Sequence, residues 1–133
     1  MNQDNNISKL IRYRINRAKE TIAEVENLIE LGYFNTSINR IYYACYYAVN
    51  ALIIKKGLSA KSHDGVRQMF GLHYVKTGLI PKELAKYYTD LFDRRHTSDY
   101  DDFVVYKKET VLELYKPASE FIKTIEKLIE LKN

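Results

Sequence analysis

Cysteine is nearly absent from this chain, and tryptophan is missing altogether. The single thiol, Cys45, cannot form an internal disulfide, and it lies in an apolar run that predicts burial rather than reactivity. The sequence contains no cysteine pair that could bind zinc and no glycine-rich loop that could hold a phosphate. These absences argue against a disulfide scaffold, a cysteine zinc site and a P-loop nucleotide site.

Long apolar stretches are absent as well. No charge-free run approaches the roughly 18 residues that a membrane-spanning helix needs. The first six residues are polar and lack the apolar region of a secretory signal. Together with the lone cysteine, these features lead us to expect a cytoplasmic protein without a membrane segment.

Charge and aromatic content limit the choice of partners only loosely. The chain has 21 basic and 17 acidic side chains, for a net charge of +4, which allows an acidic partner such as RNA without requiring one. Twelve tyrosines are more informative, because phenol rings suit helix packing, dimer surfaces and base stacking. We expect packing to account for most of them.

The spacing of apolar residues is helical throughout, and no alternating strand pattern of five or more residues occurs. The pattern predicts a first helix over residues 7–31, ended by Gly32. A second helix is expected to be capped by Asn35 or Thr36 and to stop at Gly57. Because nearly every residue from Ile41 to Ile54 is apolar or aromatic, this second helix should be central in the fold or covered by a second subunit.

The second half of the chain predicts three further helical segments. A short third helix is expected after Ser62 and through Val75, although two glycines weaken this prediction. Pro81 should begin a fourth helix that ends near residues 95–98, before a polar bend at 99–102. Pro117 should kink or divide the last helix. We therefore expect an all-α fold, an up-and-down four-helix bundle with an additional short helix, in a single domain over residues 1–133 with a core of about 7–131.

The three histidines are scattered, at positions 63, 73 and 96, and none forms a helical pair such as H-E-x-x-H. We therefore expect no metal and no cofactor.

Several polar positions are difficult to explain as plain surface. Arg40 precedes a tyrosine-rich helix in which an unpaired charge would be costly, and His63 lies just before the third helix. Arg94 and Arg95 close the fourth helix. Arg95 and Asp99 are four apart and share a face if the helix extends that far, where they would form either a functional cluster or a solvated ion pair.

Four short segments, in this order and spacing, resemble the motifs of the HEPN superfamily, in particular its small stand-alone bacterial and archaeal members. They are residues 39–44 (NRIYYA), 61–66 (KSHDGV), 70–76 (FGLHYVK) and 95–100 (RHTSDY). The resemblance covers roughly residues 7–129, nearly the whole chain.

The resemblance implies a helical bundle that forms a homodimer and is often encoded beside a minimal nucleotidyltransferase, as a toxin and antitoxin pair. In nuclease members, an arginine and a histidine spaced as R-x4-6-H meet across the dimer and cleave RNA without a metal. In such a reaction the 2′-hydroxyl attacks the adjacent phosphate, the histidine moves protons and the arginine stabilises the developing negative charge.

The chain departs from this motif at its histidine. The fifth residue after Arg94 is Asp99, and the fifth after Arg95 is Tyr100, whereas His96 is too close to either arginine. An ionised aspartate repels phosphate, and a tyrosine with an ordinary pKa is a poor base at neutral pH. Whether the protein is an enzyme therefore stays open.

Three interpretations remain at this point. In the first, the protein is a ribonuclease or toxin with Arg95, Asp99 and Tyr100 as catalytic residues, or with His63 delivered by the fold to move the proton. In the second, it is a non-catalytic dimer that binds RNA, a nucleotide or a nucleotidyltransferase, with Arg40, His63 and Arg94 as ligand-binding residues. In the third, the same polar residues form a structural network at helix ends.

Overall fold

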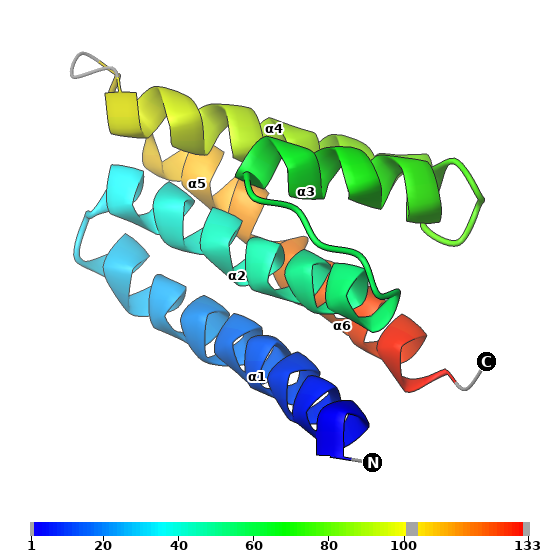
Figure 1. The fold of residues 1–133 in the computed structure, drawn as a ribbon. Helices are drawn as coiled ribbons and strands as arrows, with labels where there is room; N and C mark the ends of the chain where they lie inside the picture. Colours follow the sequence, from blue (N-terminus) through cyan, green and yellow to red (C-terminus); the bar gives the residue numbers. More distant parts are fainter. Residues whose placement is uncertain (1, 101–103, 132–133) are drawn as a thin grey trace.

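The computed structural model describes residues 2–100 and 104–131, with side chains described for residues 5–97 and 104–131. All the regular structure in these ranges is helical (Figure 1), which confirms the all-α prediction. The helices are α1 (Asn2–Glu30), α2 (Phe34–Lys55), α3 (His63–Phe70), the π-helical turn η1 (Gly71–Val75), α4 (Lys82–Tyr100), α5 (Lys108–Tyr115) and α6 (Ala118–Glu130). Within the described ranges, none of these helices is apolar over a length that could cross a membrane.

Helix α2 is the centre of the bundle. It packs along α1 and also contacts α3, α4, α5 and α6. In Figure 1, α5 and α6 pass behind α2, and α3 and α4 lie on the side opposite α1. Neighbouring helices of the same chain therefore cover most sides of α2, which is the first of the two explanations expected for its near-continuous apolar sequence.

The turn between α1 and α2 depends on Gly32, whose φ of +82° is strained for residues with a side chain. The prediction of a side-chain cap at Asn35 or Thr36 was wrong, because α2 begins at Phe34 after Tyr33, which makes no side-chain cap. Asn35 instead bonds the segment before α5. Its Nδ2 donates to the Val104 carbonyl at 2.8 Å, and its Oδ1 accepts from the Tyr106 amide at 3.0 Å.

The connection from α2 to α3 turns at Gly57, with φ +79°, and ends at Ser62. The Ser62 Oγ accepts a hydrogen bond from the Gly65 amide at 2.9 Å, which confirms Ser62 as the cap of the third helix. The loop runs back along α2 before α3 begins (Figure 1), so His63, the first residue of α3, lies beside the middle of α2.

Helix α4 is longer at its end than the sequence predicted. Its first residue, Lys82, follows Pro81, and its backbone stays helical through Asp99 and Tyr100. The bend predicted for residues 99–102 therefore does not begin at Asp99. Polar residues are compatible with the interior of a helix, so polarity alone does not determine where the helix ends. The side chains of Asp99 and Tyr100 lie outside the described residues, as do residues 101–103.

Pro117 divides the last helical segment into α5 and α6, as predicted. A proline has no N–H to donate to the preceding turn, so the ladder is interrupted at residues 116–117. The end of α6 is closed by Lys55 of α2, whose Nζ donates to the carbonyls of Leu128 at 3.2 Å and Leu131 at 2.7 Å. The charge stabilises the negative end of the helix dipole.

Aromatic rings link the two sides of the bundle. The Tyr88 and Phe121 rings stack with centroids 5.8 Å apart, and Phe70 contacts both at 5.7 and 6.2 Å. Tyr42 continues the series on α2, 5.9 Å from Tyr88. This core fixes how α2, α3 and α4 sit together, and it thereby positions the polar residues at its edge.

Candidate functional site

His63 and Tyr42 form the first contact of the candidate site. The Tyr42 hydroxyl and His63 Nδ1 are 2.8 Å apart, although the residues are 21 positions apart in the sequence. Tyr42 is fully buried on α2, whereas His63 is only half-buried at the start of α3. The hydrogen bond therefore fixes the orientation of a partly accessible imidazole ring.

Arg95 of α4 approaches the same tyrosine ring. Its guanidinium carbon lies 4.8 Å from the centre of the Tyr42 ring and 5.8–5.9 Å from those of Phe92 and Tyr43. Only 9% of Arg95 is exposed. The aromatic faces thus hold a largely desolvated cation.

Tyr46 completes the cluster from the next turn of α2. Its ring stacks on that of His63, with centroids 4.2 Å apart and planes within 9° of parallel. We refer to Tyr42, Tyr46, His63 and Arg95 as the Arg95–His63 cluster. It draws its members from three helices, α2, α3 and α4.

The electrostatics of the cluster keep its histidine neutral. Burial lowers the pKa of His63, and the nearby Arg95 charge lowers it further. Burial raises the pKa of Tyr42 to about 12, so its hydroxyl keeps its proton at neutral pH. A neutral imidazole with one nitrogen bonded to Tyr42 can use its other nitrogen to accept or donate a proton, according to the tautomer.

The two neighbouring arginines on α4 have different surroundings. The Arg94 Nε donates to Asp90 Oδ1 at 3.0 Å, and its guanidinium carbon lies 5.8 Å from the centre of the Tyr106 ring. Successive residues of a helix point about 100° apart, so Arg94 faces the segment before α5 while Arg95 faces α2 and α3.

Arg40 is paired with α1. Its Nη2 lies 3.4 Å from Glu24 Oε2, and its side chain is 27% exposed. This partner removes the unpaired charge that the sequence suggested. The structure therefore brings Arg95 and His63 together, places Arg40 and Arg94 in other ion pairs, and leaves the side chains of Asp99 and Tyr100 undescribed.

Neither a metal site nor a reactive thiol emerges from the described residues. Within residues 5–97 and 104–131, no three His, Cys, Asp or Glu side chains gather as metal ligands would. Cys45 is fully buried, and burial raises its pKa to about 12, which keeps it a thiol.

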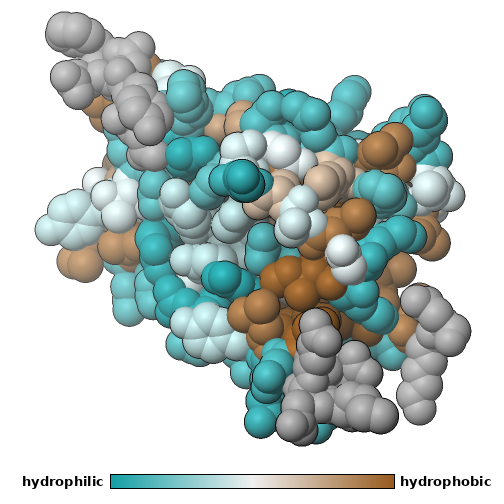
Figure 2. Space-filling model, in the orientation of Figure 1, coloured by the Kyte–Doolittle hydropathy of each residue, from teal (hydrophilic) through white to brown (hydrophobic). Residues whose placement is uncertain are grey.

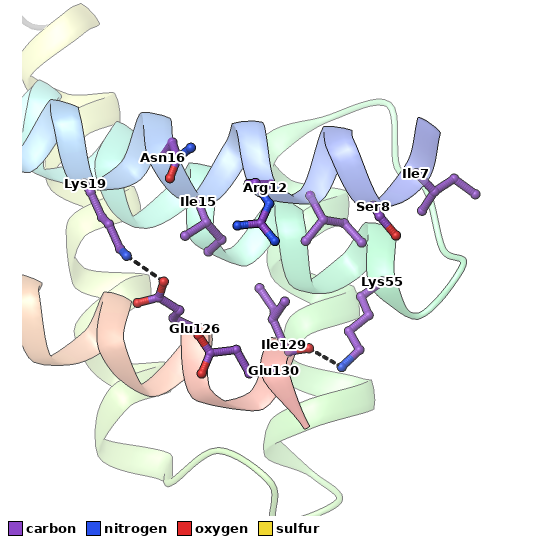
Figure 3. Close-up of a pocket in the computed structure, with 11 residues that line it drawn as sticks. Ile7, Ser8, Arg12, Ile15, Asn16, Lys19, Lys55, Glu126, Ile129 and Glu130 are labelled. Carbon is purple, nitrogen blue, oxygen red and sulfur yellow. Dashed lines mark hydrogen bonds and ion pairs between the residues drawn. The ribbon is translucent and has the colours of Figure 1, made fainter. Parts of the chain in front are cut away.

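A groove of about 530 Å³ lies elsewhere, between α1 and α6 (Figure 3). Its floor is aliphatic, with Ile7, Ile11 and Ile15 from α1 and Ile129 from α6. Lys19 pairs with Glu126 across it at 2.6 Å, and Lys55 is bonded to the end of α6. Because no aromatic or histidine side chain lines it and two of its cations are engaged, the groove is a weaker candidate site than the Arg95–His63 cluster.

The fold is that of a small helical bundle, and comparison with known families places it in the HEPN class. The model of the HEPN domain matches residues 11–128, so the chain belongs to the HEPN domain family. The superfamily resemblance predicted from the four motifs is thereby confirmed.

The relatives extend this assignment to bacteria and archaea. A UPF0332 protein of Thermotoga maritima is 40% identical over 126 residues, covering 95% of this chain and 96% of its own length. A protein of Methanocaldococcus jannaschii named "Putative toxin MJ0142" is 32% identical, over 90% of this chain and 81% of its own. The crystal structure of ST0689, an archaeal HEPN homologue, has a TM-score of 0.72 at 16% identity, over 90% of this chain and 98% of that one.

Sequence reasoning missed two residues of the cluster, Tyr42 and Tyr46. Their spacing of four places both on one face of α2, but the same spacing occurs in Tyr43 and Tyr47, and we expected packing to account for most of the tyrosines. Only the position of His63 distinguishes the first pair, and that position depends on the loop that carries the chain back across α2.

Proposed function

We propose that this protein acts on RNA at the Arg95–His63 cluster, as the HEPN component of a toxin and antitoxin pair. The observation that supports the proposal is that Arg95 and His63 both contact Tyr42. The Arg95 guanidinium carbon lies 4.8 Å from the centre of the ring, and His63 Nδ1 lies 2.8 Å from the hydroxyl. The sequence lacks a histidine at the spacing of the family motif, and in this proposal His63 of α3 takes its role. The toxin name of a relative supports the biological setting.

The chemistry follows from the surroundings of each group. Neutral His63, with its Nδ1–H donating to the Tyr42 oxygen, presents the lone pair of Nε2 and can accept the proton of a ribose 2′-hydroxyl. The 2′-oxygen then attacks the adjacent phosphorus to form a 2′,3′-cyclic phosphate. The P–O5′ bond breaks, and the leaving 5′-oxygen takes up the proton that His63 has accepted, directly or through water. Arg95 stabilises the additional negative charge on the phosphate oxygens, which a desolvated guanidinium does more strongly than a solvated one.

A non-catalytic binding module is the second candidate. The burial of Arg95, at 9% exposure, favours it, because an arginine held by three aromatic rings also serves as a structural element. In this case the cluster would bind RNA or a nucleotide without cleaving it.

Cleavage of end-labelled RNA in chelator separates the two candidates. We expect His63→Gln to slow cleavage by about 10²–10⁴-fold and Arg95→Gln by about 10²–10³-fold. Arg94→Gln removes the same charge one residue away and should retain most of the rate, because Arg94 is paired with Asp90.

Each outcome of this experiment favours one candidate. Wild-type protein that binds RNA through Arg95 and His63 without cutting it would support the binding module. Wild-type protein that neither binds nor cuts RNA would exclude both, provided that circular dichroism shows a folded helical chain.

The assembly belongs to the same proposal. We expect a homodimer and a complex with a minimal nucleotidyltransferase, on the grounds of the family motifs in residues 39–100. Light scattering on a sizing column measures the first, and co-purification after joint expression with a neighbouring nucleotidyltransferase gene tests the second. A chain that is monomeric at all accessible concentrations would contradict the dimer.

A further inference from the structure

One surface strip of α2 is left open between α1 and α3. It carries Tyr43, Tyr46 and Tyr47, all half-buried, with ring centroids 6.1–6.2 Å apart. We call these three residues the α2 aromatic strip. In Figure 2 the surface over this part of α2 is pale and teal, whereas brown side chains gather toward the end of α2 and the start of α1. The strip is thus distinct from the aliphatic surface of the molecule.

Arginines of α1 border the strip on one side. The Arg17 guanidinium carbon lies 5.5 Å from the centre of the Tyr47 ring. Burial raises the pKa of the Tyr46 hydroxyl, and the nearby Arg14 charge partly opposes this rise. The Nε of Arg14 is buried and has no hydrogen-bond partner among the described residues. The acid near Arg17 is Glu20, 3.9 Å away and 65% exposed, which leaves the border basic.

The other border of the strip is the Arg95–His63 cluster. Tyr46 belongs to both, since it stacks on His63 at 4.2 Å and lies 6.1 Å from Tyr47. A continuous row therefore runs from Arg17 through Tyr47 and Tyr46 to His63. The row begins with a cation and continues with consecutive aromatic rings, and proteins that bind single-stranded nucleic acid combine the same two kinds of group.

We propose that the α2 aromatic strip binds the bases of single-stranded RNA, with Arg14 and Arg17 on its phosphates, and so leads the strand to His63. The inference rests on the proposed function and adds a path for the strand. Tyrosine faces accept any base, and they are accessible only to unpaired ones, so the strip favours a single strand over a duplex. A mononucleotide can fill only the His63 end.

A second copy of the chain is the competing occupant, because tyrosine and arginine are common in protein interfaces. The charges favour RNA. A two-fold interface over the strip would enclose the Arg14 and Arg17 side chains of both copies, and like charges within one interface disfavour association.

The test measures binding of a fluorescein-labelled, unstructured oligoribonucleotide of about ten nucleotides, within the roughly 4–16 that single-strand sites occupy. Fluorescence anisotropy is recorded in chelator over a series of salt concentrations. We expect Tyr47→Ala to weaken binding by a factor of about 5–150. Arg17→Gln should flatten the plot of log affinity against log salt by about 0.7, because the variant neutralises one phosphate fewer. The labelled duplex should bind more weakly than the single strand.

Two controls match these variants in type. Lys123→Gln removes a charge from an exposed position of α6, and Tyr33→Ala removes a ring that is 58% exposed in the α1–α2 turn. Both should bind the oligonucleotide as wild type does.

The outcomes separate this inference from the proposed function. If Arg95→Gln abolishes RNA binding while Tyr47→Ala and Arg17→Gln bind as wild type does, the strip is not a path for the strand and the proposed function stands. If wild-type protein neither binds nor cuts RNA, both are wrong. If Tyr47→Ala leaves RNA binding intact and converts an oligomer into a monomer in light scattering, the strip is a self-association surface and the inference is overturned.

Discussion

At the scale of single residues, Tyr42 contacts both a neutral histidine and a cation. Tyr42 presents its hydroxyl to His63 and its face to Arg95, at 2.8 and 4.8 Å. A hydrogen-bonded imidazole and a guanidinium thereby come close enough to interact without needing a direct contact. Because this coupling is electrostatic, it is measurable as a pKa.

Removing the charge of Arg95 should change the titration of His63. Burial and Arg95 both lower the pKa of His63 in the folded protein. We expect Arg95→Gln to raise this pKa while leaving it below the ordinary histidine value, because burial remains. The measurement is the chemical shift of the His63 ring protons against pH by NMR, with Arg94→Gln as the control of equal charge. An unchanged pKa in Arg95→Gln would contradict the electrostatic role of Arg95.

The lowered pKa of His63 also determines how the free energy of unfolding changes with pH. The unfolded chain binds a proton at His63 near pH 6.5, whereas the folded chain binds it only at lower pH. The free energy of unfolding therefore falls as the pH drops from about 6.5 through the folded pKa, and this contribution is constant above that window. His63→Gln should remove this part of the pH dependence of urea unfolding.

At the scale of elements, the start of α3 matters most, because it places His63. The Ser62 Oγ accepts a hydrogen bond from the Gly65 amide, and loop residues 57–62 span the distance back to the middle of α2. The sequence predicted this cap from the residue type alone. It could not predict which residues of α2 the capped helix would meet, because that depends on the path of the loop.

Loss of the cap should weaken α3. We expect Ser62→Ala to lower the free energy of unfolding by about 1 kcal/mol, since the Gly65 amide would lose its partner in the first turn. Ser59→Ala, in the same exposed loop, is the matched control and should change it by less than about 0.5 kcal/mol. Urea denaturation followed by circular dichroism at 222 nm measures both. Equal effects of the two variants would argue against the cap.

At the scale of the whole molecule, the aromatic core joins α6 to α3 and α4. Phe121 is fully buried and contacts Phe70, Tyr87 and Tyr88 at centroid distances of 5.6–6.2 Å. The cluster lies at the edge of this core, because Tyr42 stacks on Tyr88. The rigidity of the site therefore depends on packing that is remote from its chemistry.

A cavity in this core should be costly. We expect Phe121→Ala to lower the free energy of unfolding by about 3–5 kcal/mol, a large share of the roughly 5–15 kcal/mol typical of a folded chain. Leu79→Ala, at a residue that is 50% exposed, is the control and should cost far less. Thermal unfolding reports both values. A loss below about 1 kcal/mol for Phe121→Ala would mean that the core collapses around the gap.

The sequence by itself determined the helical class, the breaks at Gly32, Gly57 and Pro117, and the family, and it limited α2 to a central place or to a place covered by a second subunit. These features depend on local periodicity and backbone chemistry, which can be read from neighbouring residues. It erred in the cap of α2, where Tyr33 precedes the helix and Asn35 bonds residues 104 and 106 instead. A side chain that hydrogen-bonds a distant segment leaves no pattern in the residues next to it in the sequence.

The tertiary structure alone decided which candidate residues meet. Arg94 and Arg95 are neighbours in the sequence, yet Arg94 pairs with Asp90 and Arg95 packs over Tyr42. His63 was suggested by its place before a helix, and its hydrogen bond to Tyr42 required the chain to return over 21 residues. Contacts of this kind depend on how loops and packed helices are arranged in space, and spacing along the chain does not encode that arrangement.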